Sequence, residues 1–386
     1  MSLDRRRVAV ALAGFITFIN LYSTQSLLPL LAQELGAGAR AVSLTVSATT
    51  FAIALIAPFT GTVADVLGRK RVIVTAMAAL VVPTALIAGA GGLDAIVLWR
   101  FVQGLLLPPV FAVTIAYVGE ELPPAEATAV TGIYLSASSF GGFFGRFATG
   151  VLAEGIGWRG AFLVLAAITL LAALAVAWLL PRERRFERSP GLLSSARQML
   201  RHLRNSQLLA TYAVGFGVLF TFVASFTYVS FHLAAPPFGL SPAGLGAIFA
   251  TYLTGAATTL LTGRAVARFG RRALVVALTA VWAAGMLLTL LPSLTAIVLG
   301  LAISAGSGFV CQAVATGFVA VTAREGRSSA VGLYVTCYYI GGSVGGVLPG
   351  FLWDRWGWPG AVVIVLAMLA VIAVFVGVFW KGSSKL

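Results

Sequence analysis

Charged residues are scarce in this sequence: Asp, Glu, Lys and Arg make up 10% of the 386 residues, whereas 59% are hydrophobic. A soluble domain carries about 25% charged residues, so this composition excludes one. Apolar runs of about 20 residues recur along the chain, which is the length that a helix needs to cross the hydrocarbon core. We therefore predict an all-α membrane protein that crosses the bilayer many times.

Cysteine and histidine are also scarce, with two residues of each. Both cysteines, Cys311 and Cys337, fall inside apolar runs, so neither a disulfide framework nor a metal site is indicated. The sequence pairs no nucleophile with a base and has no phosphate-binding loop in a suitable setting. We therefore expect neither an enzyme, nor a bound metal, nor a cofactor.

The apolar runs divide into twelve expected membrane spans. Their approximate bounds are 8–32, 42–66, 72–90, 93–118, 127–153, 160–181, 207–233, 242–266, 272–291, 294–321, 328–350 and 359–380. One long polar stretch divides them, which predicts an N-terminal six-helix bundle at 1–181, a cytoplasmic linker at 182–206 and a C-terminal six-helix bundle at 207–386. The leucines and arginines between 192 and 204 suit a basic helix on the inner leaflet or a flexible linker.

The net charge of +14 follows from where the basic residues are placed. If the N-terminus is cytoplasmic, 21 of the 26 Lys and Arg residues fall in or beside cytoplasmic segments. This asymmetry is the positive-inside rule, and it predicts that both termini are cytoplasmic. The excess of basic residues therefore reflects membrane topology rather than nucleic-acid binding.

Acidic residues are missing from the spans, because all twelve Asp and Glu lie in loops or at span ends. A proton-coupled exporter of cations usually holds a carboxylate inside the membrane. If protons are coupled here, the candidates are Asp65, Glu34 and His232. Two arginines, Arg100 and Arg146, do fall inside spans, and their charge favours a neutral or anionic substrate.

The two halves of the chain are internal repeats. Residues 132–161 align without gaps on residues 332–361, with eleven identical positions. A second similar pair is GTVADVLGRKR at 61–71 and GRAVARFGRRA at 263–273. Parallel repeats of six spans predict two bundles related by an axis along the membrane normal, with a substrate site between them near the midplane.

The segment GTVADVLGRKRV at 61–72 joins the second and third spans. Gly61 permits a close helix approach, Gly68 permits a tight turn, and Asp65 stands beside three cations. A basic loop that only anchors to anionic lipid would explain the cations, but it would not explain the glycines or Asp65.

This segment resembles the loop signature of the major facilitator superfamily, G-x-L-a-D-r-x-G-r-k. The residues that match it in place are Gly61, Asp65, Gly68, Arg69 and Lys70. The resemblance covers the whole chain and implies twelve transmembrane helices in two pseudo-symmetric six-helix bundles. It also implies an inner gate, in which Asp65 faces the eleventh helix and Arg69 pairs with Glu120 or Glu121.

The fourth span begins with WRFVQG, which resembles the R-x-x-Q-G motif of that family at Arg100, Gln103 and Gly104. Arg100 and Gln103 are three residues apart and share a helix face. The resemblance implies that Arg100 takes part in proton coupling or shapes the substrate cavity. The alternative is that Arg100 extends outward to the membrane surface.

The fifth span contains SSFGGFFGRFATG at 138–150, whose glycines permit close helix packing. With their repeats in the eleventh span, the packing glycines are Gly141, Gly142, Gly145, Gly341, Gly342 and Gly345. The pattern G-G-x-x-G-R is similar to a bacterial subgroup of twelve-span drug/proton antiporters, although the antiporter signature's proline is absent before Gly141. Arg146, whose repeat partner is Gly346, either faces the outer half of the cavity or extends to the surface.

Other polar residues of the spans are candidates for the central cavity, although such residues often bond a neighbouring helix instead. They are Asn20, Tyr22, Gln25, Tyr252, Gln312, Tyr338 and Tyr339. The expected partners are a small-molecule substrate, the lipid bilayer and, if transport is coupled, protons. We expect a monomer and no nucleic-acid partner.

Together these features predict a secondary active transporter of the bacterial inner membrane that works by alternating access and exports small amphipathic compounds or drugs by proton antiport. One alternative is a carrier for an anionic or zwitterionic metabolite or lipid, not necessarily proton-coupled. The other is a membrane receptor without transport. In a transporter, we expect Arg146→Ala to abolish flux and to leave the folded yield intact.

Overall fold

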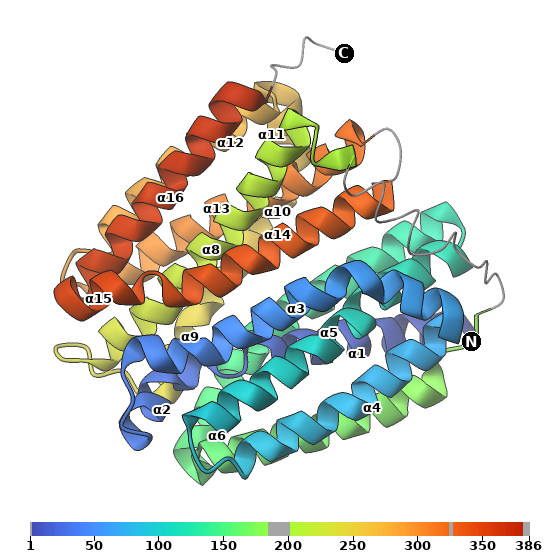
Figure 1. Ribbon diagram of the computed structural model, residues 1–386, viewed down its shortest axis with the longest axis horizontal. Coiled ribbons are helices and arrows are strands. Elements are labelled where there is room, and N and C mark those ends of the chain that lie inside the picture. The colour runs from blue at the N-terminus through green and yellow to red at the C-terminus, as the bar shows by residue number, and fades with distance from the viewer. Residues whose placement is uncertain (1, 184–200, 324–326, 381–386) are drawn as a thin grey trace. The chain divides into compact units, whose positions relative to one another are not determined.

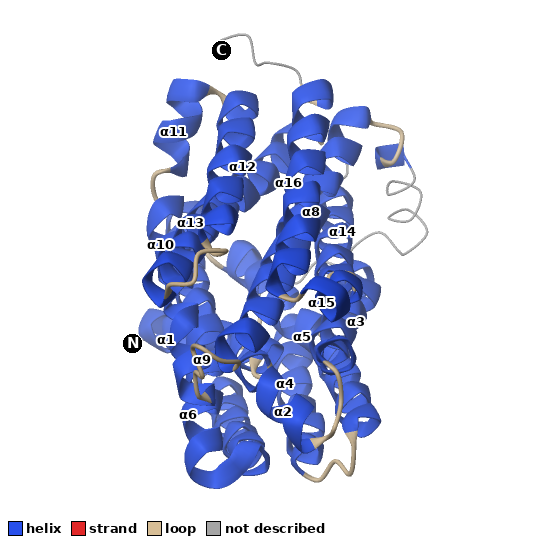
Figure 2. Ribbon diagram, turned by 90° about the vertical axis from the view of Figure 1, so that its left-hand side faces the viewer, coloured by secondary structure: helices blue, strands red, loops and turns tan. Residues whose placement is uncertain are grey.

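The computed structural model describes residues 2–183, 201–323 and 327–380, which form helices and turns without a strand in those ranges (Figure 1, Figure 2). The first half contains α1 Ser2–Tyr22, η1 Gln25–Leu27, α2 Leu28–Glu34, α3 Ala39–Leu67, α4 Arg69–Ala88, α5 Leu93–Glu121 and α6 Pro124–Leu179. The second half contains α8 Ser206–Ala234, α9 Pro242–Ile248, η2 Phe249–Thr251, α10 Tyr252–Thr259, α11 Thr262–Phe269, α12 Arg271–Leu288, α13 Leu294–Thr322, α14 Arg327–Val347, α15 Gly350–Trp356 and α16 Trp358–Phe379. The linker helix expected between 192 and 204 falls largely outside the described residues.

The number of membrane spans follows from helix lengths. Ten described segments are long and apolar enough to cross a membrane, and the bent pair Pro242–Thr259 with Thr262–Phe269 makes an eleventh. The 56 residues of α6 would measure ~84 Å at 1.5 Å per residue, far more than the ~30 Å core requires. Gly157 interrupts α6 with φ 73° and ψ 162°, so α6 supplies two spans. The predicted all-α fold with twelve spans is thereby confirmed.

The helices group into two compact units. Unit 1 comprises Met1–Ala37, Ala48–Leu192 and Leu240–Ala247, and unit 2 comprises Gly38–Ser47, Leu193–Gly239 and Ile248–Leu386. Most of each half therefore lies in one unit. The first residues of α3 belong to unit 2, and most of α9 belongs to unit 1.

Glycines bring α6 close to α1 within unit 1. A Cβ atom added to Gly141 would lie 2.9 Å from the Cα of Phe15, and one added to Gly145 would lie 2.7 Å from the Cα of Ile19. These distances are shorter than real carbon contacts, so only glycine permits this approach. Gly142 is also buried, and a Cβ there would face the Arg146 guanidinium at 3.6 Å.

The same packing recurs in unit 2 between α14 and α8. A Cβ atom at Gly341 would lie 2.7 Å from the Cα of Phe216, and one at Gly345 would lie 2.8 Å from the Cα of Phe220. Gly342, the repeat of Gly142, is buried as well. The first and fifth spans of each unit therefore pack through corresponding residues, as the sequence repeat predicts.

Turns also recur at corresponding positions. Gly68 precedes α4 with φ 90°, and Gly270 precedes α12 with φ 75°. Gly157 and Gly357, which precede the last span of each half, have φ of 73° and 60°. Positive φ angles cost glycine little and other residues much, so these four glycines fix where the spans turn.

We expect Gly145→Ala to lower the folded yield and the melting temperature of the purified protein, with a loss of about 1–3 kcal/mol, because the new methyl group would overlap the α1 backbone. Gly132→Ala is the matched control, since a Cβ there would meet no atom within 4 Å. Equal melting temperatures for the two variants would contradict the packing role of Gly145.

Candidate functional site

The first membrane span is discontinuous. α1 ends at Tyr22, a turn follows at Ser23 and Thr24, and the chain continues through η1 into α2. Pro29 lies in the first turn of α2, where its missing N–H costs no hydrogen bond within that helix. Backbone groups at such a break need other partners inside a membrane. Side chains from α5 and α6 provide them.

Arg100 of α5 binds one side of the break. Its side chain is fully buried, and Nη1 donates to the carbonyl of Asn20 and to Oε1 of Gln103, both at 2.7 Å. Nη2 donates to the carbonyl of Leu21. The planar fork of donors suits a side chain that must reach two adjacent carbonyls. Arg100 therefore points into unit 1, and the alternative that it extends to the membrane surface is wrong.

Hydrogen bonds continue from Arg100 through the core of unit 1. Nε2 of Gln103 donates to Oγ1 of Thr84 at 2.7 Å, and that hydroxyl lies 3.0 Å from Oδ1 of Asn20. Nδ2 of Asn20 lies 3.0 Å from Oγ1 of Thr169. This network is fully buried and joins α1, α4, α5 and α6.

Arg146 of α6 binds the other side of the break. Nε donates to Oε1 of Gln25 at 2.7 Å, and Nη1 donates to the carbonyl of Gly142 at 2.6 Å. The guanidinium carbon lies 4.0 Å from the centre of the Tyr22 ring, in a cation–π geometry. Arg146 is 2% exposed, so it does not extend to the membrane surface.

Hydroxyl groups complete this side of the break. Oγ of Ser26 donates to the Arg146 carbonyl at 2.7 Å, and Oγ1 of Thr149 donates to the Ser23 carbonyl at 2.9 Å. The structure thus brings together six of the predicted cavity residues, which we call the broken-span cluster: Asn20, Tyr22, Gln25, Arg100, Gln103 and Arg146. The predicted candidates did not include the serines and threonines that surround them. The polar run STQS followed by Pro29 is a sequence signal for such a break.

The candidate residues of the second half lie in a different environment within unit 2. The Tyr252 ring lies 4.4 Å from the Phe226 ring and 5.7 Å from the Phe309 ring, between centres. Tyr338 and Tyr339 lie on α14 with ring centres 5.4 Å apart, and α13 carries the half-buried Gln312. The polar core of unit 1 therefore corresponds to an aromatic core in unit 2.

Arg69 is the centre of an ion-pair network among the residues predicted to form an inner gate. Nε and Nη2 donate to the two carboxylate oxygens of Glu120 at 3.0 and 2.7 Å, and Nη2 lies 2.6 Å from Oδ1 of Asp65. The Gly61 carbonyl is 3.5 Å from Nη1. The prediction that Gly61 permits a close helix approach is wrong, because an added Cβ atom would meet nothing within 4 Å. Of the two acids expected to pair with Arg69, Glu120 makes the bidentate contact, and Glu121 lies half-buried beside it. The contact between Asp65 and the eleventh helix remains a prediction.

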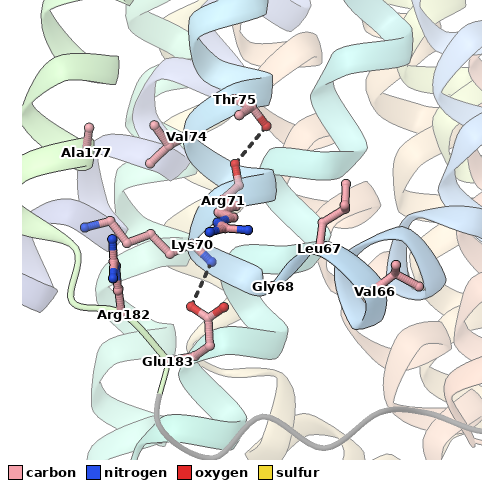
Figure 3. Close-up of a pocket in the computed structure, with 10 residues that line it drawn as sticks. All are labelled: Val66, Leu67, Gly68, Lys70, Arg71, Val74, Thr75, Ala177, Arg182 and Glu183. Atoms are coloured by element: carbon pink, nitrogen blue, oxygen red, sulfur yellow. Dashed lines mark hydrogen bonds between the residues drawn. The ribbon is translucent and has the colours of Figure 1, made fainter.

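Gly68 and Lys70 lie beside this network. Gly68 makes the turn before α4, and Lys70 lines a cavity with Arg182 and Glu183 (Figure 3). Neither residue pairs with Glu120 in the bonds described above.

Two other acid–base candidates are engaged near span ends. Oε2 of Glu34 accepts a hydrogen bond from Trp158 Nε1 at 2.6 Å and lies 3.8 Å from Arg159. The His232 ring is stacked at 5.8 Å on the Trp358 ring. These contacts hold neighbouring spans together.

A repeat of six-span units and a polar cluster at a broken helix are typical of secondary transporters. Comparison with protein families gives the same result: the model described as Major Facilitator Superfamily matches residues 10–236 and residues 221–385. The chain belongs to this superfamily and is a multi-pass membrane transporter.

Relatives of similar length support this assignment. The "Inner membrane transport protein YnfM" of Escherichia coli K12 is 34% identical over 377 residues, covering 96% of this chain and 89% of the relative. The "Uncharacterized MFS-type transporter YybF" of Bacillus subtilis 168 is 31% identical over 360 residues, covering 93% and 89%. Among solved structures, the nucleoside transporter NupG (D323A mutant) has a TM-score of 0.81 at 14% identity, covering 97% of this chain and 100% of that one. At that identity, the likeness demonstrates a shared fold only.

Proposed function

We propose that the protein is a secondary active transporter that works by alternating access and exports small amphipathic compounds, including drugs, in exchange for protons. The observation that carries the proposal is the discontinuous first span. Transporters commonly form their substrate sites where a membrane helix is interrupted. Polar side chains of five spans meet around this interruption in an otherwise apolar chain.

The proposed substrate contacts within unit 1 are the amide and phenol groups of the broken-span cluster. Within unit 2 they are Tyr252, Gln312, Tyr338 and Tyr339. Arg100 and Arg146 give unit 1 a positive potential, which favours neutral or anionic amphiphiles over cations. The charge also supports the alternative substrate class, an anionic or zwitterionic metabolite or lipid.

The inner gate is the proposed point of proton coupling. Asp65 and Glu120 share one guanidinium, so protonation of either carboxylate would weaken the attachment of Arg69 to it. An alternating-access cycle needs an inner gate that opens and closes. We further propose a monomer in the bacterial cytoplasmic membrane, with both termini in the cytoplasm.

The test uses purified protein in liposomes with an acidic interior. Three probes differ in charge: neutral chloramphenicol, anionic salicylate and cationic ethidium. We expect uphill accumulation of the neutral or anionic probe, which stops when an ionophore collapses the pH gradient. Carrier-mediated flux that does not depend on the pH gradient would contradict antiport and would favour a facilitative carrier. Saturable binding without flux would favour a receptor.

A further inference from the structure

A cavity of about 590 Å³ lies in unit 1 where α4 begins and α6 ends (Figure 3). Its polar lining consists of Lys70, Arg71, Thr75, Arg182 and Glu183, and its apolar lining includes Val66, Leu67, Val74 and Ala177. Three cations, one hydroxyl group and one carboxylate thus line a cavity whose other walls are mainly hydrocarbon. The location is the end of the membrane-spanning helices that the positive-inside rule assigns to the cytoplasm.

A second cavity, of about 400 Å³, occupies the corresponding place in unit 2. It is lined by Phe269, Gly270, Arg271, Arg272, Ala273, Val276, Ala373 and Gly377. Gly270, Val276 and Gly377 are the repeat positions of Gly68, Val74 and Ala177, which line the first cavity. Each half therefore has a cavity with basic and apolar lining residues, at the place where its third span begins and its sixth span ends.

We propose that each cavity binds the phosphate group of one anionic phospholipid from the cytoplasmic leaflet. Basic pockets between helices on this side of a membrane suit anionic headgroups. The apolar walls suit the attached chains: Leu67 is 54% exposed and Phe269 is 59% exposed at the two cavities. A free anion would gain nothing from these exposed apolar side chains.

The charged linings of the two cavities differ in one cation and one acid. In unit 1 the carboxylate of Glu183 accepts a hydrogen bond from the backbone amide of Lys70 at 3.3 Å (Figure 3). An anion of the chain itself thus lies among the cations. The residues that line the second cavity include no acid. Three cations and one acid line the first cavity and two cations line the second, so each lining has a net charge of +2. We therefore expect the two cavities to bind anionic lipid with similar affinity, and Glu183→Gln to strengthen binding in unit 1 alone.

Native mass spectrometry of the full-length protein in detergent tests the proposal, with dioleoyl phosphatidylglycerol as the probe and dioleoyl phosphatidylcholine as the neutral comparison. We expect two tightly retained phosphatidylglycerol molecules. Arg182→Gln and Arg272→Gln should each weaken one of them about fivefold, as expected for loss of one cation near the headgroup. Arg268→Gln is the matched control, because Arg268 is exposed on α11 but lines neither cavity.

Several results would overturn the proposal. One is an equal loss of lipid in Arg268→Gln, which would indicate general attraction to the basic surface. Equal retention of phosphatidylcholine, or displacement of the lipid by millimolar inorganic phosphate, would exclude a phospholipid site. Weaker binding in Glu183→Gln would also contradict it. All four substituted residues lie at the protein surface or its margin, and a melting curve of each variant checks that it is folded.

Discussion

Arg100→Ala is expected to abolish transport and to destabilise the protein by about 3–5 kcal/mol. The substitution removes a fully buried guanidinium that donates to the Asn20 and Leu21 carbonyls and to Gln103. These acceptors would be left in a core without water to replace the lost donors. The measurements are the melting temperature of the purified variant and its flux in liposomes per folded molecule.

Two further variants define the cause of that loss. Arg100→Lys retains the charge, but an ammonium group cannot span two adjacent carbonyls as a fork, so we expect an intermediate loss of stability and flux. Arg355→Ala removes an exposed arginine of α15 and should change the stability by no more than about 0.5 kcal/mol. Wild-type stability in Arg100→Ala would show that the break does not depend on this side chain.

The repeat was predictable from the sequence because its signals are local. Glycines spaced four apart predict close packing wherever the partner helix lies, and the matching stretch 200 residues later predicts the same packing again. Gly141 and Gly145 do pack against α1, and Gly341 and Gly345 against α8. Hydropathy alone likewise predicts two spans within α6, one on each side of the interruption at Gly157.

The partners of the buried arginines were not predictable in the same way. Arg100 binds backbone carbonyls some 80 residues away. Every residue has a backbone carbonyl, so the sequence does not indicate which ones accept these hydrogen bonds. The spans contain no acid that could pair with these arginines, and residue types alone therefore favour an open cavity around them. The ion pair between Arg69 and Glu120 was easier to predict, because both residues are charged and both lie at span ends. The choice of Glu120 over its neighbour depended on helix rotation, which the structure provides.

The broken span also explains an asymmetry between the halves. Position 346, the repeat of Arg146, is glycine, and the counterpart of α1 is α8, which runs unbroken from Ser206 to Ala234. An unbroken helix satisfies its own carbonyls and needs no buried cation beside it. Arg146 thus accompanies the break in α1, and we infer that holding this break is its first role.

Arg146→Ala should therefore reduce both flux and stability, by at least tenfold and by about 2–4 kcal/mol. The bond to Gln25, the bond to the Gly142 carbonyl and the contact with the Tyr22 ring would all be lost. This expectation differs from the one drawn from sequence, in which flux is lost and the folded yield is intact. Melting curves and liposome flux, measured on the same preparation, distinguish these two expectations.

Variants of Tyr22 and of Arg146 itself show which contact of Arg146 is responsible for the loss of stability and flux. Tyr22→Phe retains the ring beneath the guanidinium and should behave almost as the wild type, whereas Tyr22→Leu should cost about 0.5–2 kcal/mol. Arg146→Lys should retain the selectivity between salicylate and chloramphenicol, because the positive potential is unchanged, but it should lower the rate for both. If Arg146→Ala instead melts like the wild type and loses only salicylate transport, Arg146 contacts the substrate directly. Since 2% of Arg146 is exposed and its Nε and Nη1 are already bonded within the protein, we expect Arg146→Ala to lose both stability and flux.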